Sequence, residues 1–205
     1  MEKVLASILA LLLSHVIIAS TIGTHFKNQP GPRPVPNIGM DHHFRVGFGI
    51  NNFGMDYTFG VRFFNRFSIG AGAGLKTLRA PIFTSLSVQQ QPKINLLSFP
   101  VYLHSEVSIW NKGNFNVYGY GMFGRSFYTS NENTTTDKSV PSFYAELGAG
   151  IRWKRERNSV GVGLSQFYTN TKGTARIDYL DTDAFVDYNL EIYNLTFNIT
   201  LTRFL

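Results

Sequence analysis

The sequence contains no cysteine, which excludes disulfide cross-links and any chemistry that depends on a thiol. It is also poor in charge, because Asp, Glu, Lys and Arg make up 16% of the residues, whereas an ordinary soluble domain carries about a quarter. Beyond the N-terminal region, no segment approaches the ~20 consecutive apolar residues that a membrane-spanning helix needs. The net charge is +6, but the basic residues are scattered along the chain, so the composition does not indicate nucleic acid binding.

The N-terminus carries one apolar run, VLASILALLLSHVIIAS, which small residues follow. This layout is typical of a secretory signal peptide, and we assign residues 1–22 to it, with cleavage near Ser20 or Gly23. A membrane-anchoring helix is the alternative, but the run is a little short for a full span. Residues 23–41 include four prolines between positions 30 and 36, which predicts a semi-rigid, extended periplasmic leader. The folded domain is then expected over residues 42–205.

From residue 43 onward the chain falls into segments in which apolar residues alternate with small or polar ones. The stretch SIGAGAGLK at residues 68–76 is one example, with glycine at every second position. Each segment is about the ten residues that a tilted transmembrane β-strand requires. The eight segments cover residues 44–50, 55–63, 67–76, 97–107, 115–125, 143–153, 159–168 and 194–202.

The two faces of these segments indicate which side meets water. In a soluble barrel the apolar face is the core, and the other face carries abundant Lys, Glu and Thr. Here the second face is mostly Gly, Ser and Thr, with isolated charges of both signs. Such a face fits the interior of a narrow eight-stranded barrel, where only side chains find room. We therefore expect Gly70, Gly72 and Gly74 to point into a crowded lumen, and their apolar neighbours to face lipid.

The segment at residues 115–125 is ambiguous in phase, because tyrosine and glycine alternate there. We place Tyr118, Tyr120 and Met122 on the outward face, and Gly119 and Gly121 on the inward face.

The connections between segments alternate in length. Short ones follow the second, fourth and sixth strands, at residues 65–66, 110–114 and 154–158, and long ones follow the third, fifth and seventh, at residues 78–92, 126–141 and 169–189. Short periplasmic turns and long outer loops are typical of outer-membrane barrels. The short connection at residues 51–54 departs from this pattern. The sequence thus predicts an all-β fold, an eight-stranded antiparallel up-and-down transmembrane β-barrel of outer-membrane type behind a cleavable signal peptide. Ten strands are the alternative if long loops extend as hairpins.

Three stretches carry a resemblance to a known family. LSFPVYL at residues 97–103, ELGAGI at 146–151 and YNLTFNITL at 193–201 are similar to strands of the outer membrane protein beta-barrel domain family, the porin-family or PorT-like small barrels of Bacteroidetes. The resemblance covers residues 42–205 and implies a membrane barrel without shared catalytic residues. Members usually end on an aromatic residue, whereas this chain ends with Phe204 followed by Leu205.

Isolated charges fall on the predicted inward face. Ions cut off from bulk water persist only when they are paired, so these residues are expected to form salt-bridged networks that plug the lumen. We expect a periplasmic layer of Glu106 with some of Arg45, Arg62 and Arg152, and an outer layer of Lys76 with Asp56 and Glu146. The complete predicted set is Arg45, Asp56, Arg62, Lys76, His104, Glu106, Glu146 and Arg152.

Other motifs do not predict a site. The glycines of residues 70–74 lack the helix and the acidic residue of a nucleotide-binding loop. In His104-Ser105-Glu106, alternation places the serine on the lipid face and its potential base in the lumen, which prevents their hydrogen bond. Asp41-His42-His43 is interpreted as a solvated start of a strand, because neighbouring histidines diverge on a strand. The aspartates at 178, 181, 183 and 187 lack the glycine and glutamate of a calcium loop. We expect no catalytic, cofactor-binding or metal-binding residues.

These observations favour a small outer-membrane barrel with a structural or surface-interaction role and a lumen plugged by side chains. A narrow pore or a transport- or secretion-accessory barrel is the first alternative, and a lipid A-modifying enzyme is the second. The expected partners are outer-membrane lipid, lipopolysaccharide and, during insertion, the barrel-assembly machinery. Fold class alone does not choose among these roles.

Overall fold

The computed structural model describes residues 38–64, 66–81, 93–129, 134–136, 142–155, 157–179 and 182–205. The expected signal peptide and residues 23–37 of the expected leader lie outside the described residues, so both stay predictions. The strands are β1 (Ile38–Gly49), β2 (Asn52–Phe63), β3 (Phe67–Pro81), β4 (Lys93–Lys112), β5 (Phe115–Thr129), β6 (Thr134–Thr136), β7 (Ser142–Arg155), β8 (Asn158–Tyr179) and β9 (Thr182–Phe204). No helix long and apolar enough to cross a membrane occurs in this part of the chain.

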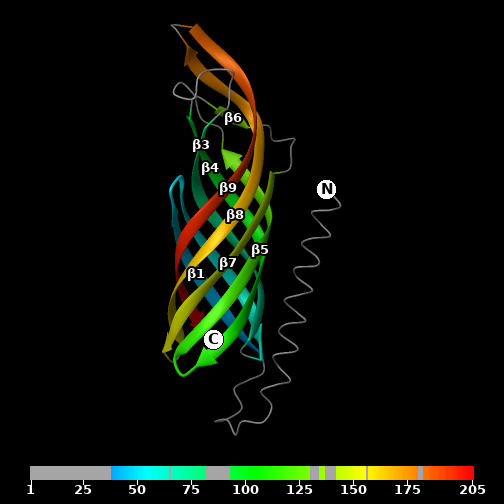
Figure 1. The fold of residues 1–205 in the computed structure, drawn as a ribbon. Helices are drawn as coiled ribbons and strands as arrows, with labels where there is room; N and C mark the ends of the chain where they lie inside the picture. Colours follow the sequence, from blue (N-terminus) through cyan, green and yellow to red (C-terminus); the bar gives the residue numbers. More distant parts are fainter. Residues whose placement is uncertain are drawn as a thin grey trace.

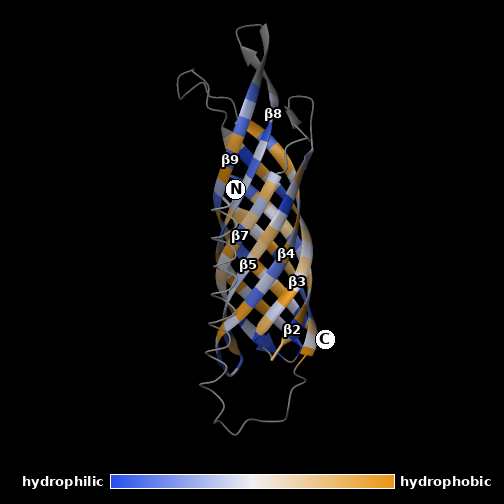
Figure 2. Cartoon of the chain, turned by 90° about the vertical axis from the view of Figure 1, so that its right-hand side faces the viewer, coloured by the Kyte–Doolittle hydropathy of each residue, from blue (hydrophilic) through white to orange (hydrophobic). Residues whose placement is uncertain are grey.

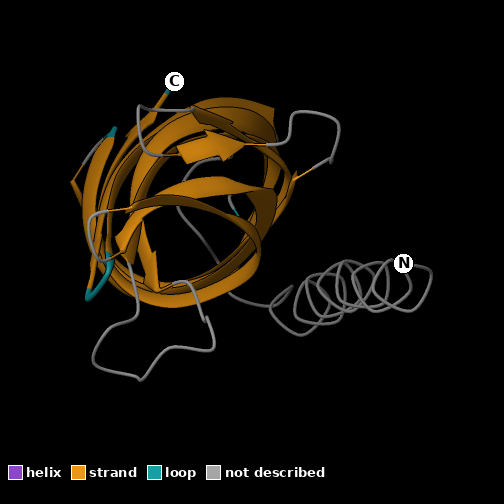
Figure 3. Cartoon of the chain, turned by 90° about the horizontal axis from the view of Figure 1, so that it is seen from above, coloured by secondary structure: helices purple, strands orange, loops and turns teal. Residues whose placement is uncertain are grey.

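Eight of the strands close into a barrel with an up-and-down order (Figures 1 and 3). Each wall strand pairs antiparallel with its neighbour in the chain, and β1 closes the circle by pairing with β9. The three-residue β6 is not part of this circle. It pairs with β8 from Thr134↔Ala175 to Thr136↔Gly173, beyond the stretch of β8 that pairs with β7. The predicted fold class, an eight-stranded antiparallel up-and-down barrel, is confirmed.

The barrel wall is apolar outside and mostly polar inside. Figure 2 shows the corresponding alternation of hydropathy along the strands. On β9 the outward side chains Leu195, Phe197 and Ile199 are 65%, 45% and 40% exposed. The intervening Thr196 and Asn198 are buried. This arrangement is the reverse of a soluble protein, and it matches a wall that faces hydrocarbon.

The apolar exterior forms a band of limited height. On β9 it begins at Tyr193 and ends at Leu201, and the outward residues beyond these limits are Glu191 on one side and Arg203 on the other. An apolar band between an aromatic rim and charged residues is typical of a transmembrane barrel. The structure is therefore that of a transmembrane barrel.

Tight turns join the strands at one end, which we call the short-turn end. There β2 ends at Phe63 and β3 begins at Phe67, and β4 and β5 are joined through Gly113 in the left-handed conformation, with φ of 56°. A hydrogen bond connects the turn between β2 and β3 to β4. The Ser108 amide donates to the Arg66 carbonyl at 2.7 Å. Both ends of the described chain, Ile38 and Leu205, lie at this end. Ile38 starts β1, so the barrel begins before the expected residue 42.

At the opposite end, the hairpin of β8 and β9 continues past the barrel wall. Its pairing runs without interruption from Thr169↔Ile192 to Tyr179↔Thr182, through residues 169–189 that we expected to be a loop. That expectation was wrong because we read the polar residues of the segment as loop composition. The period of two persists there, with Thr171, Tyr188 and Leu190 buried between polar outward neighbours. The wall itself has eight strands, not ten.

Candidate functional site

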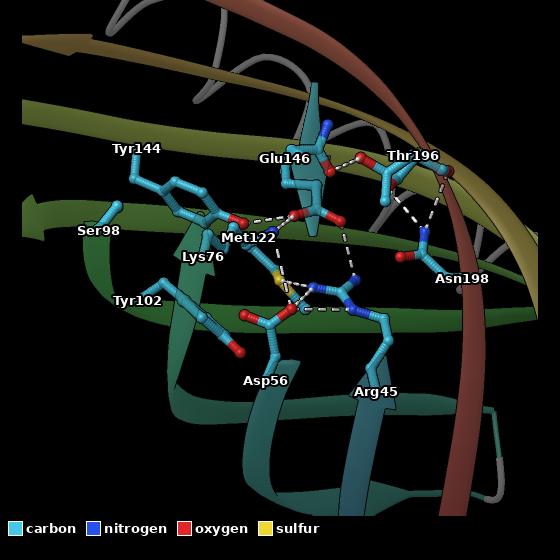
Figure 4. A network of polar contacts seen from close by, with 12 residues as sticks. Arg45, Asp56, Lys76, Ser98, Tyr102, Met122, Tyr144, Glu146, Thr196 and Asn198 are labelled. Carbon is cyan, nitrogen blue, oxygen red and sulfur yellow. Dashed lines mark hydrogen bonds and ion pairs between the residues drawn. The ribbon is translucent and has the colours of Figure 1, made fainter. Parts of the chain in front are cut away.

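Four charged side chains from four strands meet inside the wall, toward the hairpin end (Figure 4). Arg45 on β1 binds Asp56 on β2 at 2.8 Å and Glu146 on β7 at 3.0 Å. Lys76 on β3 binds Glu146 at 2.8 Å and lies 3.7 Å from Asp56. All four side chains are almost completely buried. We call these four residues the outer cluster, and its bonds cross the lumen because β7 lies opposite β1 to β3 in the strand order.

Aromatic side chains complete the surroundings of the outer cluster. The hydroxyls of Tyr144 and Tyr120 donate hydrogen bonds to the two carboxylate oxygens of Glu146, the second at 3.3 Å. The Lys76 ammonium lies 4.9 Å from the centroid of the Phe167 ring. Arg45 lies 4.9 Å from the Tyr120 ring centroid. Glu146 thus receives two cations and two hydroxyls, which compensate its loss of hydration.

A second group of charges lies toward the short-turn end. Arg152 on β7 pairs with Glu106 on β4, and His43 on β1 lies 4.0 Å from Glu106 and 3.3 Å from Asp41. The rings of His43 and His104 are 5.3 Å apart. We call these five residues the inner cluster.

The structure differs from the expected layers at two arginines. Arg45 was expected beside Glu106 but belongs to the outer cluster, because its antiparallel partner on β2 is Asp56 itself. Arg62 was expected beside Glu106 as well. It is half-buried near the short-turn end, and it stacks on Phe204 with its guanidinium carbon 4.1 Å from the ring centroid. The other predicted residues lie inside the wall, in the two clusters described.

Sequence reasoning missed Asp41 and His43. We interpreted Asp41-His42-His43 as a solvated start of a strand, but Asp41 is 1% exposed and His43 is 5% exposed, both in the lumen. Only His42 faces outward, where it hydrogen-bonds the hydroxyl of Tyr57 at 2.5 Å. The sequence does contain a signal for this placement. With β1 starting at Ile38, Asp41, His43 and Arg45 fall on every second position and therefore on the same inward face.

The phase predicted for β5 was also wrong. Tyr118, Tyr120 and Met122 are 1%, 4% and 5% exposed and point inward, so Gly119 and Gly121 lie on the outer face. The reason is cross-strand pairing with the inward glycines of β7.

Tyr118 and Tyr120 stand opposite Gly150 and Gly148, which have no side chain to fill the space that the two rings occupy. A Cβ atom on Gly150 would lie 2.8 Å from Tyr118 Cζ, closer than real contacts allow. Glycines of the wall therefore do more than relieve crowding, because they create room for two rings that contact the charged clusters. The Tyr120 hydroxyl donates to Glu146, and the Arg152 guanidinium carbon lies 3.9 Å from the centroid of the Tyr118 ring.

Apolar side chains fill the lumen beside the outer cluster and from there toward the hairpin end. They form one buried group with the inward tyrosines and occupy the inner faces of β3, β4, β8 and β9 near the hairpin end. The group includes Leu78, Ala80, Ile94, Leu96, Phe167, Tyr188, Leu190 and Ile192.

Two small cavities lie lower in the barrel. One is between the two clusters and contacts His43, Arg45 and Tyr120, and the other is at the short-turn end beside Arg62 and Lys154. Each has a cavity volume of about 10 Å³. That space is close to the minimum for a single water molecule.

The geometry also bears on the motifs that could carry chemistry. His104 and Glu106 are buried in the lumen, whereas Ser105 pairs with Gly121 on the outer face. No group of three or more His, Asp and Glu side chains able to hold a metal ion occurs within the described ranges. Of the four aspartates near the hairpin tip, the structure describes the side chain of Asp187, which accepts a hydrogen bond from Thr174 at 2.9 Å. Asp181 lies outside the described residues.

This chain is similar to known proteins in structure, as the comparison with solved structures shows. No family model matches the chain, and no curated protein matches it by sequence. The outer membrane protein OprG from Pseudomonas aeruginosa has a similar structure, with a TM-score of 0.51, 8% identity, and coverage of 82% of this chain and 96% of that one. Neisserial surface protein A has a TM-score of 0.47 and 8% identity, and the match covers 81% of this chain and 94% of that one. The outer membrane protein AlkL, solved in DMPC bilayers, has a TM-score of 0.47 and 12% identity, and the match covers 87% of this chain and 96% of that one. The fold is that of small outer-membrane barrels.

Proposed function

We propose that this chain is a small outer-membrane barrel protein with a structural or surface-interaction role and a lumen closed to ions by its own side chains. The observation that carries the proposal is that side chains of two kinds, charged and apolar, fill the lumen. Paired charges occupy its middle and short-turn end, and an apolar group occupies its hairpin end.

A conducted ion would have to pass both the paired charges and the apolar group. It would displace Lys76 or Arg45 from the buried carboxylate of Glu146, which they hold at 2.8 Å and 3.0 Å. It would then meet Leu78 and Leu96, which are both 2% exposed and offer no ligand to an ion. Eight strands leave an interior just wide enough for side chains, so no wet path runs beside these groups. This argument favours the plugged barrel over the narrow pore.

The extended hairpin of β8 and β9 supports the surface-interaction part of the proposal. Beyond the apolar band, the outward side chains that the structure describes on this hairpin are polar, and they include Lys172, Asn189 and Glu191. Such a surface suits contact with water, lipopolysaccharide head groups or another surface rather than with hydrocarbon. In this proposal the hairpin end faces outward, the short-turn end faces the periplasm, and the signal peptide expected from residues 1–22 directs export. Membership in the PorT-like barrels of Bacteroidetes stays a prediction from the three similar strands, and insertion by the barrel-assembly machinery belongs to the same proposal.

Planar bilayer recording tests the closed lumen. Purified protein is refolded in neutral detergent, its folded fraction is measured by heat-modifiable gel mobility, and it is reconstituted beside a general porin as positive control. We expect no resolved conductance steps from the barrel under conditions where the porin gives them. Regular steps that change size in a Glu146→Gln variant would favour the narrow pore instead.

The enzyme alternative needs a separate experiment. We propose no catalytic role, because Ser105 is separated from His104 and Glu106 by the barrel wall. Mass spectrometry of lipid A from cells with and without the protein is expected to give identical spectra. A mass shift that disappears in a Ser105→Ala variant would overturn this part of the proposal.

A further inference from the structure

Three polar residues lie side by side on the outer face of the barrel at the short-turn end. Arg155 on β7 is the register partner of Asn158 on β8, and Asn158 is the partner of Arg203 on β9. All three residues are exposed. Neighbouring strands lie about 4.8 Å apart, so the Cα atoms of the two arginines are separated by ~10 Å with the asparagine between them. We call these three residues the arginine row.

The arginine row borders the apolar band directly. Two positions further into the wall, the same three strands carry Trp153, Val160 and Leu201, which pair across the strands and are 47%, 51% and 49% exposed. Tryptophan is enriched where hydrocarbon meets lipid head groups, because its ring is apolar and its N–H is polar. When the band lies in hydrocarbon, the row therefore lies at the level of the head groups.

The charges near the row do not balance. At the short-turn end, the carboxylate side chains that the structure describes are those of Asp41 and Glu106, and both are buried in the lumen as part of the inner cluster. The barrel wall separates them from the outward row. The turn after β7 reads Arg155-Glu156-Arg157, in which two arginines stand against one glutamate, and Glu156 lies outside the described residues. The outer rim of this end thus keeps an excess of positive charge.

Main-chain hydrogen bonds hold the rim in place. The Phe204 amide donates to the Arg157 carbonyl at 2.7 Å, so the turn after β7 is attached to the end of β9. The Leu205 amide donates to the Met40 carbonyl at 2.8 Å, and the Leu205 carbonyl oxygen accepts from the Met40 amide at 3.4 Å. The backbones that carry the two arginines are therefore fixed relative to each other, which lowers the entropy cost of binding one ligand between them.

The chemistry of the row suits a phosphate group. Within the described residues, neither Arg155 nor Arg203 forms an ion pair with a carboxylate. The planar guanidinium matches the oxygens of a phosphate, and the side-chain amide of Asn158 is a further donor between the two arginines. A zwitterionic head group brings its own cation to such a site, whereas an anionic head group leaves the phosphate charge to the protein.

We infer that the arginine row binds the phosphate of one anionic phospholipid in the membrane leaflet at the short-turn end. Arg155 and Arg203 approach the phosphate from two sides, the Asn158 amide donates between them, and the acyl chains lie against the apolar residues around Trp153. This inference rests on the membrane placement in the proposed function, and it is independent of whether the lumen conducts ions.

Trp153 provides a local probe of the lipid beside the row. The chain has two tryptophans, so Trp110→Phe leaves Trp153 as the single fluorophore. The full-length processed barrel with this change is reconstituted in phosphatidylcholine vesicles, in which phosphatidylcholine or phosphatidylglycerol with brominated acyl chains replaces a rising fraction of the lipid. Bromine quenches tryptophan at short range, so the quenching reports which lipid lies beside Trp153.

We expect brominated phosphatidylglycerol to reach half-maximal quenching at a mole fraction about tenfold lower than brominated phosphatidylcholine. Arg155→Met and Arg203→Met are each expected to reduce this preference by about threefold or more, the effect of one basic residue at an anionic surface. The folded fraction of each variant is verified by heat-modifiable gel mobility. If one variant does not fold, the comparison of the two lipids on the barrel with both arginines still decides the question.

Lys112→Met is the matched control. Lys112 is exposed on β4 and pairs with Phe115, which pairs with Trp153, so Lys112 and Arg203 lie at comparable distances from the fluorophore, each two strands away. A phenyl ring rather than Asn158 separates Lys112 from β7. Removing this cation is expected to change the lipid preference by less than about twofold, because exposed charges outside the site are screened by salt.

Two results would overturn the inference while the proposed function stands. One is equal quenching of Trp153 by the two brominated lipids. The other is a loss of preference in Lys112→Met as large as in Arg155→Met, which would show that general surface charge attracts the lipid. Quenching by neither lipid would overturn the inference together with the placement of the apolar band in hydrocarbon.

Discussion

Lys76 and Glu146 are 70 residues apart in the chain, yet the Lys76 ammonium donates to Glu146 Oε2 at 2.8 Å across the barrel interior. Neither side chain reaches bulk water. The pair thus connects opposite sides of the wall, and its strength depends on the closure of the sheet that brings β3 to face β7.

Glu146→Gln is expected to destabilise the barrel by ~3–5 kcal/mol, because it leaves Arg45 and Lys76 with one carboxylate, Asp56, in a buried site. Urea unfolding of the barrel in lipid vesicles measures the effect. Glu191→Gln, on the exposed face of β9, serves as control with an expected change within ~0.5 kcal/mol. Adding Lys76→Met to Glu146→Gln should cost less than Lys76→Met alone, and strict additivity would show that the two residues are not coupled.

Leu147→Arg is expected to cost ~2–4 kcal/mol, because Leu147 is exposed on the outer face in the middle of β7, where the wall meets hydrocarbon. Asn189→Arg provides the comparison, since Asn189 is also outward but lies beyond the apolar band on β9. The two variants are compared by unfolding in phosphatidylcholine vesicles. Equal stabilities would mean that the band does not contact the hydrocarbon core.

Gly150→Ala is expected to destabilise the barrel by ~1–3 kcal/mol through overpacking. The new Cβ would lie 2.8 Å from Tyr118 Cζ and 2.6 Å from the Val162 carbonyl oxygen. Gly119→Ala is the control, because its Cβ points outward and meets Ile109 Cδ1 at an ordinary 3.6 Å. The folded fraction on a heat-modifiable gel and the urea midpoint report both. If only Gly119→Ala lost stability, the inward and outward faces assigned to β5 would be wrong.

The orientation in the membrane is tested with single cysteines, since the chain has none of its own. A cysteine replacing Lys172, exposed on the hairpin, is expected to react with a membrane-impermeant maleimide on intact cells. A cysteine replacing Arg155, exposed at the short-turn end, is expected to react only after the outer membrane is permeabilised. If the cysteine at position 155 reacts on intact cells and the cysteine at position 172 does not, the orientation of the barrel in the membrane is the reverse of the one proposed.

The sequence by itself determined the fold class, because a strict period of two leaves a strand only one apolar face. It also identified the lumen side, since a face of glycine, serine and sparse charges such as Arg45 and Glu146 is too small and too weakly charged for a water-exposed surface. The repeated lengths of about ten residues and the short connections predicted eight wall strands from local pattern alone.

The tertiary structure alone decided the partners. Whether Tyr118 points inward depends on the glycines that β7 places opposite it, and the choice of Arg45 between Asp56 and Glu106 depends on the register of β1 with β2. The length of the β8–β9 hairpin likewise depends on pairing between residues such as Thr169 and Ile192. The physical reason is common to all three. Alternation tells which face a side chain occupies, but its height in the barrel and its neighbours across the lumen follow from strand register and closure, which no local period encodes.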